Sequence, residues 1–299
     1  MPFFSIIIPT YNRLPLLRQT LESVWAQRFA DYKVIVVDDG STDGTWEELQ
    51  ALGSRVRALR QQNAGPGAAR NLGAQHSTGE YLAFLDSDDV WFPWTLETYA
   101  SVIRAQRAPA FIAGKPFRFH EETELRGVKL SPVQTNNFSD YLASGSEWRW
   151  WGVSSFVIRR DVFEAAGKFA NEWVNGEDAD LALRLGVAPG FVQVTNPVTF
   201  GYREHDGSAM KNLSKTLAGT WLGIHTEQAG KYPGGGSRSH ERWRIITRHA
   251  RPVTFDCLLH GLHNDAWKLY RAMVRWHVAL GRWKYLVGFP MKALIGRIK

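Results

Sequence analysis

Three carboxylates stand within the four residues Asp86-Ser87-Asp88-Asp89, directly after the apolar run Tyr81–Leu85. Packed together, such groups repel one another and raise one another's pKa. A divalent cation would relieve this repulsion, and hard oxygen ligands suit Mg²⁺ or Mn²⁺, which can bridge to a diphosphate. The alternative is a capping cluster for the next helix, because Asp is favoured at helix N-termini. The segment by itself leaves both interpretations open.

A second acidic pair, Asp38-Asp39, follows the apolar run Val34–Val37 and precedes Gly40-Ser41. Asp38 fits an Asx turn that caps the following helix. Asp39 could instead accept hydrogen bonds from a nucleotide base or ribose. Both roles are compatible with the pattern.

A glycine-rich turn, Asn63–Gly67, opens a helix-like segment that carries Arg70. It has neither the Gly-x-x-x-x-Gly-Lys-Ser/Thr pattern nor Gly-x-Gly-x-x-Gly, which counts against P-loop ATPases and NAD enzymes. Arg70 could donate two hydrogen bonds to a phosphate or a base. The alternative for Arg70 is a surface salt bridge.

Two later segments carry further candidates. In Gly176–Asp180, Asp178 could act as a general base toward an acceptor hydroxyl. The helix dipole also favours acids in a first turn, and this segment alone favours that structural role. After the run Val198–Tyr202, Arg203 could neutralise phosphate, and His205 could bind a metal or a diphosphate.

Apolar runs alternate with helix-spaced residues through the first half of the chain, which predicts an α/β fold. Repeated strand–helix–strand units favour a mostly parallel, twisted sheet with helices on both faces. Ligands bind such sheets at the carboxyl ends of the strands, where the candidates above lie. We expect strands at 4–8, 34–37, 56–59 and 81–85, and helices at 14–25, 46–52 and 68–75.

The remainder of the chain is less uniform. Residues 115–151 predict long loops, and structured segments return between 153 and 203. A Pro-Gly-Gly-Gly-Ser segment near 232–239 is typical of a flexible connection, and helical spacing follows over 254–286. We therefore expect a catalytic domain at 1–212 and a helical, basic extension at 213–299.

Taken in order, the segments resemble the inverting family-2 glycosyltransferases. The resemblance covers about residues 4–210 and rests on six pieces at compatible spacing. They are Ser5–Arg13, Val36–Asp43, Asn63–Gly73, Gly79–Asp89, Gly176–Leu185 and Arg203-x-His205-x-x-Ser208.

The resemblance implies a GT-A fold and a role for each matching residue. Pro9, Tyr11 and Asp39 would hold the nucleobase, with Arg70 nearby. Asp86 would contact the ribose or the metal, and Asp88 would ligate Mn²⁺ or Mg²⁺. The remaining assignments are Asp178 as the base in a Glu177–Asp178 pair, His205 at the metal or diphosphate, and Arg203 beside the diphosphate.

The implied reaction is a single displacement with inversion at the anomeric carbon. A nucleoside-diphosphate sugar, with UDP-sugar favoured, would donate to a hydroxyl of a glycan, lipid-linked or other acceptor. Trp148, Trp150 and Trp151 could stack on acceptor sugars or equally fill a core.

Composition is globular, and the single Cys257 excludes an internal disulfide framework and a Cys-rich zinc site. The start of the chain lacks a signal-peptide pattern, and no apolar stretch is long enough for a spanning helix, so we expect a cytoplasmic protein.

Charge is unevenly placed along the chain. Residues 238–299 hold 13 Lys and Arg against 3 Asp and Glu, a net +10, while the rest holds 23 against 26, or −3. Basic residues alternate with aromatic ones over 267–284, which favours contact with the inner face of an anionic membrane. The alternatives are packing on the catalytic domain or a homo-oligomer contact. No nucleic-acid recognition motif supports a nucleic-acid partner.

Two other classes share this sheet pattern. A nucleotidyltransferase would need a basic Gly-rich phosphate loop where Pro9-Thr10-Tyr11-Asn12 stands. A binding protein that has lost catalysis is disfavoured because Asp86, Asp88, Asp178 and His205 are all present.

Overall fold

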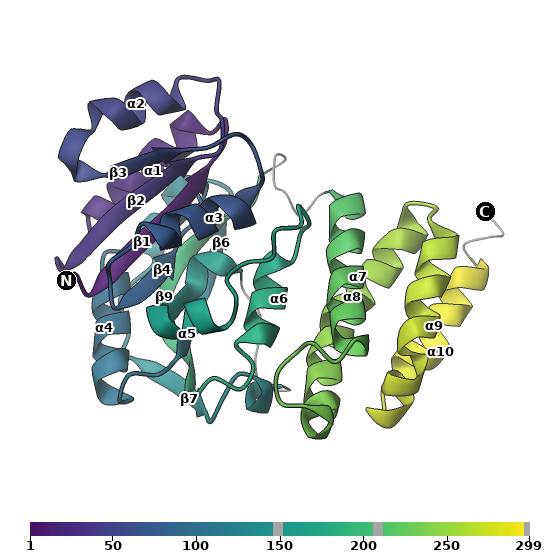
Figure 1. Ribbon diagram of the computed structural model, residues 1–299. Helices are drawn as coiled ribbons and strands as arrows, with labels where there is room; N and C mark the ends of the chain where they lie inside the picture. The colour runs from purple at the N-terminus through teal and green to yellow at the C-terminus, as the bar shows by residue number, and fades with distance from the viewer. Residues whose placement is uncertain (146–151, 206–211, 296–299) are drawn as a thin grey trace.

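A nine-stranded sheet forms the centre of the N-terminal part of the chain in the computed structural model, which describes residues 1–145, 152–205 and 212–295 (Figure 1). The strand order is β3-β2-β1-β4-β8-β6-β9-β5, with β7 also paired to β9. The bounds are β1 Phe4–Thr10, β2 Tyr32–Asp38, β3 Arg57–Arg60, β4 Tyr81–Phe84, β5 Val90–Trp91, β6 Phe111–Phe119, β7 Gln134–Phe138, β8 Phe156–Arg159 and β9 Phe191–Arg203.

The sheet is parallel in its first half and mixed in its second. Strands β3, β2, β1 and β4 all pair in parallel, as the alternating pattern predicted. Strand β8 then runs antiparallel to both β4 and β6, and β5 and β7 run antiparallel to β9. The expectation of a mostly parallel sheet is therefore corrected to a mixed one. The cause is β8, which enters between β4 and β6 in the opposite direction.

Helices cover both faces of the sheet, as expected for an α/β fold. Ile6 and Ile8 of β1 face a core shared with α1 and α4, whereas Ile7 between them faces the core shared with α3, α5 and α6. This alternation follows from the period of two in a strand. The helices are α1 Leu14–Trp25, α2 Thr45–Ala51, α3 Pro66–Gln75, α4 Thr95–Ala105, α5 Arg160–Ala165 and α6 Glu177–Arg184.

The stretch expected to hold long loops, 115–151, is partly regular. Strand β6 continues through Phe119, a 3-10 turn spans Glu122–Gly127, and β7 follows. Strand β7, Gln134–Phe138, has four consecutive polar residues, so a search for apolar runs does not find it. Trp148, Trp150 and Trp151 lie outside the described residues.

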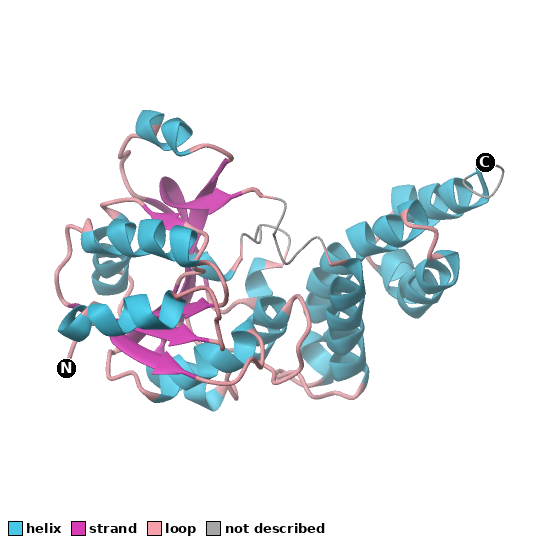
Figure 2. Ribbon diagram, turned by 90° about the horizontal axis from the view of Figure 1, so that it is seen from above, coloured by secondary structure: helices cyan, strands magenta, loops and turns pink. Residues whose placement is uncertain are grey.

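Four helices form the C-terminal part and extend away from the sheet (Figure 2). They are α7 Leu213–Gln228, α8 Ser239–Leu259, α9 His263–Ala279 and α10 Trp283–Ile295. Trp243, Leu269 and Phe289 belong to the same buried cluster as Phe84 of the sheet, so the apolar core continues from the sheet into these helices. None of the helices, over the residues described, is long and apolar enough to cross a membrane.

The glycine-rich segment near 232–239 is fastened at several points. Tyr232 is buried, and its hydroxyl donates to Asp180 Oδ1 at 2.8 Å. Arg242 donates to the carbonyls of Pro233 at 2.7 Å and Gly235 at 2.9 Å, and its guanidinium pairs with Glu227. These contacts place the segment firmly between α7 and α8. Whether it moves in solution stays a prediction.

The Arg242–Glu227 pair should contribute strongly to stability because both side chains are almost fully buried. Removing one partner leaves the other charge buried and unpaired. Glu227→Ala should therefore lower the free energy of unfolding by about 3–5 kcal/mol. The exposed Arg18–Glu48 pair offers a control: Glu48→Ala should cost about 0–1 kcal/mol. Urea unfolding measures both, and equal losses would contradict this account of the segment.

Candidate active site

Parallel pairing brings the candidate loops to one edge of the sheet. Thr10 pairs with Asp38 at the ends of β1 and β2, and Asp39 N donates to Thr10 O at 2.8 Å. Leu85 N donates to Ile7 O at 3.1 Å, which extends β4 to the residue before Asp86. The loops after β1, β2 and β4 therefore start side by side.

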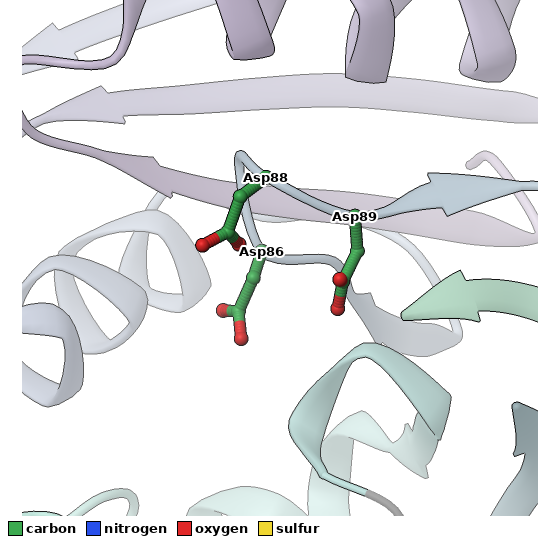
Figure 3. Close-up of side chains that lie close together, drawn as sticks. All are labelled: Asp86, Asp88 and Asp89. Carbon is green, nitrogen blue, oxygen red and sulfur yellow. The ribbon is translucent and has the colours of Figure 1, made fainter. Parts of the chain in front are cut away.

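One loop between β4 and β5 carries the three clustered carboxylates, Asp86, Asp88 and Asp89 (Figure 3). A carboxylate oxygen from each lies within 4.8 Å of the others. Asp86 and Asp88 are partly exposed, whereas Asp89 is buried. The sequence prediction that these carboxylates gather in one place is confirmed.

Asp89 has a structural role, because protein groups donate hydrogen bonds to both of its carboxylate oxygens. Its Oδ2 accepts a hydrogen bond from Ser154 Oγ at 2.6 Å, and its Oδ1 accepts one from Arg203 N at 3.0 Å. Ser154 Oγ also accepts a hydrogen bond from Asp86 N at 3.0 Å. Burial, with the charges of Asp88 and Asp86, raises the pKa of Asp89 well above its usual range. Both oxygens are thus committed to fixing the loop against β9 and Ser154.

Asp88 is held by two basic side chains. Arg13, in the loop after β1, forms an ion pair with its Oδ2, and His205 Nε2 lies 3.1 Å from the same oxygen. Burial would raise the pKa of Asp88, but the hydrogen bond to His205 and the charge of Arg13 outweigh it and lower that pKa. Asp88 and His205, each predicted as a metal ligand, thus lie in contact with one another. Arg13 was missed, although it closes the first matching piece of sequence.

Arg70 joins the cluster to the helix that follows the long loop. Its Nη2 lies 2.6 Å from Asp86 Oδ1, and its Nη1 lies 2.8 Å from Glu177 Oε1. The side chain is only 3% exposed, so the surface salt bridge considered for it is wrong. Burial would lower the pKa of Arg70, but Asp86 and Glu177 outweigh it and raise that pKa.

Helix α6 opens with three acids that have different surroundings. Glu177 pairs with Arg70, and Asp180 pairs with Arg184 and accepts from Tyr232. Asp178 forms no ion pair with any residue the structure describes; its Oδ1 accepts only from Ala179 N, at 2.8 Å. Burial and the charge of Glu177 raise the pKa of Asp178 to about 7. Asp178 is thus the acid of the three that is suited to take up a proton near neutral pH.

The residues expected to hold a nucleobase lie together beyond this cluster. Pro9 is buried at the end of β1, and Tyr11 after it is 45% exposed. Asp39 is buried, and its oxygens accept from Gln61 Nε2 at 2.7 Å, Ala64 N at 3.0 Å and Gly65 N at 2.8 Å. A carboxylate has about four acceptor positions, so roughly one remains for a ligand. In this structure, Asp39 holds the glycine-rich turn.

Arg203 braces the Asp88 loop from β9. Its Nε donates to the carbonyl of Asp88 at 3.0 Å, its Nη2 donates to Gln19 Oε1 at 2.7 Å, and its guanidinium lies over the Phe119 ring. These contacts were not predictable from sequence, because Gln19 and Phe119 belong to distant segments. These contacts hold the Arg203 guanidinium beside the Asp88 loop, and its predicted role at the diphosphate stays a prediction.

Comparison with known proteins identifies the family. The glycosyl transferase family 2 model matches residues 5–165, which is more than half of the chain, so the chain belongs to this family. It is 34% identical over 185 residues to the succinoglycan biosynthesis protein ExoW of Rhizobium meliloti, covering 55% of this chain and 57% of that one. It is 26% identical over 221 residues to the UDP-Glc:alpha-D-GlcNAc-diphosphoundecaprenol beta-1,3-glucosyltransferase WfaP of Escherichia coli, covering 73% and 83%. The chain spans little more than half the length of its first curated relatives.

Solved structures agree on the fold. Residues 1–349 of Staphylococcus aureus TarS in complex with UDP-GlcNAc superpose with a TM-score of 0.60 at 18% identity, covering 92% of both chains. The mannosyltransferase PcManGT of Pyrobaculum calidifontis, in complex with GDP-Man and Mn²⁺, gives 0.55 at 17% identity, covering 99% of this chain and 87% of that one. The chain is a glycosyltransferase with a GT-A fold and a helical C-terminal region.

Proposed function

We propose that this glycosyltransferase is a metal-dependent, inverting enzyme that uses Asp178 as its general base. It would move a sugar from a nucleoside-diphosphate sugar, with UDP favoured, to a hydroxyl of a glycan or lipid-linked acceptor. The observation that carries the proposal is the Arg70 guanidinium, which ties Asp86 of the carboxylate cluster to Glu177, the neighbour of Asp178. Arg70 thereby holds the proposed metal-binding carboxylate and the helix that carries the proposed base at a fixed separation.

The donor set fits a divalent cation. Asp88 and Asp86 offer hard oxygen atoms at the exposed side of the cluster, and Asp89 is already committed elsewhere. Mg²⁺ and Mn²⁺ accept few protein ligands when substrate phosphates complete their coordination. The ion would supply positive charge to the departing diphosphate. His205 holds Asp88 in position and would reach the ion or the diphosphate, and PcManGT was solved with Mn²⁺.

The donor is proposed to bind across the loops after β1 and β2. Tyr11 would lie against the base above Pro9, and Asp39 would accept one further hydrogen bond from the base or ribose. Arg70 orients Asp86 for the ribose or metal, and Arg203 adds positive charge near the diphosphate. UDP is favoured because WfaP is named for UDP-Glc and TarS was solved with UDP-GlcNAc, whereas PcManGT was solved with GDP-Man.

Asp178 is proposed to take the proton of the acceptor hydroxyl. A base works best when its pKa lies near the working pH, and the pKa of about 7 meets this condition. As the proton leaves, the oxygen attacks the anomeric carbon and the bond to the nucleoside diphosphate breaks. Glu177 is held by its ion pair with Arg70, and its charge contributes to the raised pKa of Asp178.

Acceptor and location follow from the relatives and from the charge pattern. WfaP is named for a diphosphoundecaprenol-linked acceptor and ExoW for succinoglycan biosynthesis, which supports a role in polysaccharide assembly. The net charge of +10 over residues 238–299 supports contact with the anionic cytoplasmic face of a membrane.

Binding of UDP should depend on the metal and on Asp88. Calorimetry with Mn²⁺ present should show UDP binding that a chelator weakens at least about tenfold, a loss of roughly 1.4 kcal/mol. Asp88→Ala should weaken it similarly, because a proposed carboxylate ligand of the metal is lost, while Glu48→Ala on helix α2 serves as the control. Equal affinity with and without chelator would remove the metal from the proposal.

Asp178→Asn should bind Mn²⁺ and UDP normally but lose transfer by about 10²–10⁴-fold, because an amide cannot accept the proton. UDP release from UDP-sugars, with water as a minimal acceptor, measures this without knowledge of the natural acceptor. Only ionised Asp178 can act as a base, so wild-type activity should rise with pH through about 7 and fall below it. If Asp178→Asn transferred sugar at the wild-type rate, or if wild-type activity did not change between pH 6 and 8, another residue would be the base.

A further inference from the structure

A pocket of about 540 Å³ lies in the C-terminal helices, apart from the carboxylate cluster. Four arginines line it, three from α8 and one from the turn before α10. They are Arg244, Arg248, Arg251 and Arg282, with Gly145 and His240 beside them. We call this feature the arginine pocket.

Among the residues that the structure describes, no acidic side chain lines the arginine pocket. Within the described part of the chain, the ion pairs of α8 are made by Arg238, with Asp140 and Glu241, and by Arg242, with Glu227. Over the same residues, Arg244, Arg251 and Arg282 take part in no ion pair. The described carboxylates near α8 thus pair with arginines outside the pocket and form no ion pair with Arg244, Arg251 or Arg282.

Carbonyl and hydroxyl oxygens orient these arginines instead. Arg282 donates to the Thr247 hydroxyl and, at 2.9 Å, to the carbonyl of Arg244. Arg248 donates to the carbonyl of Gly145 at 3.1 Å. Buried Nε of Arg251 meets no hydrogen-bond partner among the residues described. Burial, followed by the charges of Arg251, Arg248 and Arg244, lowers the pKa of Arg282 to about 10, which shows how closely the positive charges are packed.

Such a concentration of guanidinium groups selects the ligand by charge and shape. Their planar forks match phosphate and carboxylate oxygens in pairs. A single carboxylate would leave most of the positive charge uncompensated, whereas a phosphate ester or a diphosphate brings about two negative charges or more. The volume is within the range of small-ligand sites and exceeds what one phosphate needs.

The wall of the arginine pocket is connected to the catalytic edge by a short stretch of sequence. Gly145, on its wall, and Ser154, which binds Asp86 and Asp89, are nine residues apart in the sequence. Nine residues of extended chain span at most about 30 Å. A ligand held here could therefore extend toward the carboxylate cluster.

We propose that the arginine pocket binds a phosphate or diphosphate ester at a site separate from the donor site. Two sources carry this chemistry: the diphosphate of a lipid-linked acceptor, which rests on the proposed function, and the headgroup of an anionic phospholipid, which does not.

Calorimetry with inorganic pyrophosphate in a chelating buffer tests the site. The double variant Arg244→Gln, Arg251→Gln should bind at least tenfold more weakly than wild type. A matched double variant on α9, Arg271→Gln, Arg275→Gln, removes the same charge from exposed positions and should bind as wild type does. Equal weakening in both variants would show general charge attraction, and wild-type affinity in the pocket variant would place pyrophosphate elsewhere; either result overturns the proposal.

Arg251→Gln alone serves as a second variant if the double variant does not fold, because the Arg251 side chain donates no hydrogen bond to a described residue. Two further probes separate the sources. Farnesyl diphosphate that outcompetes pyrophosphate at the pocket supports the lipid-linked diphosphate. Co-sedimentation with phosphatidylglycerol vesicles, lost in the pocket variant and kept in the α9 variant, supports the headgroup. Binding of Mn²⁺ and UDP should be unchanged in all these variants, so a failure here is distinguishable from a failure of the proposed function.

Discussion

The buried guanidinium of Arg70 is the interaction on which the rest of the site depends. It lies between Asp86, at the end of a central strand, and Glu177, at the start of α6. Buried charges persist only when they are paired and hydrogen-bonded, so the three groups require one another. Because Arg is planar and donates from both arms, it fixes the separation of the two carboxylates as well as their charge.

The other charges of the site follow the same arrangement. Arg13 and His205 hold Asp88, and Arg203 braces its loop from behind. Protein cations and backbone donors thus orient the carboxylates before any ligand arrives. A site organised in this way needs little rearrangement when charge develops during a reaction, which is how fixed dipoles and charges lower a barrier. Asp178 stays outside these pairs, and burial raises its pKa to about 7.

Much of this site was predictable from sequence because its parts are local. Asp86, Asp88 and Asp39 each follow an apolar run, and parallel strands bring their carboxyl ends to one edge. The functions of Asp89 and Ser154 were not predictable, since their hydrogen bonds join residues 65 positions apart. The family resemblance covered Arg13 but assigned it no role. Helical spacing gave the C-terminal helices in part, whereas the shared core, the buried Arg242–Glu227 pair and the arginine pocket depend on tertiary packing.

The direction of β8 is a further feature that could not be predicted from the sequence. The sequence predicted structured segments from residue 153 onward, and a strand is found at Phe156–Arg159, but nothing local encodes antiparallel pairing with β4. That pairing nonetheless matters for the site, because it brings Ser154 beside the Asp86 loop. The direction and place of such a strand depend on which segments compete to pair with the same sheet edge. A single sequence does not show that competition.

The most direct test of the central claim is the affinity for Mn²⁺ and UDP, measured together with turnover, in Arg70→Lys. A lysine keeps the charge but is a point donor that cannot bind both carboxylates in the same geometry. The account predicts that binding and turnover both fall by at least about tenfold, roughly 1.4 kcal/mol each. Arg60→Lys, at the partly exposed ion pair with Asp38 on the neighbouring strand, should change neither. Wild-type binding and turnover in Arg70→Lys would contradict the account.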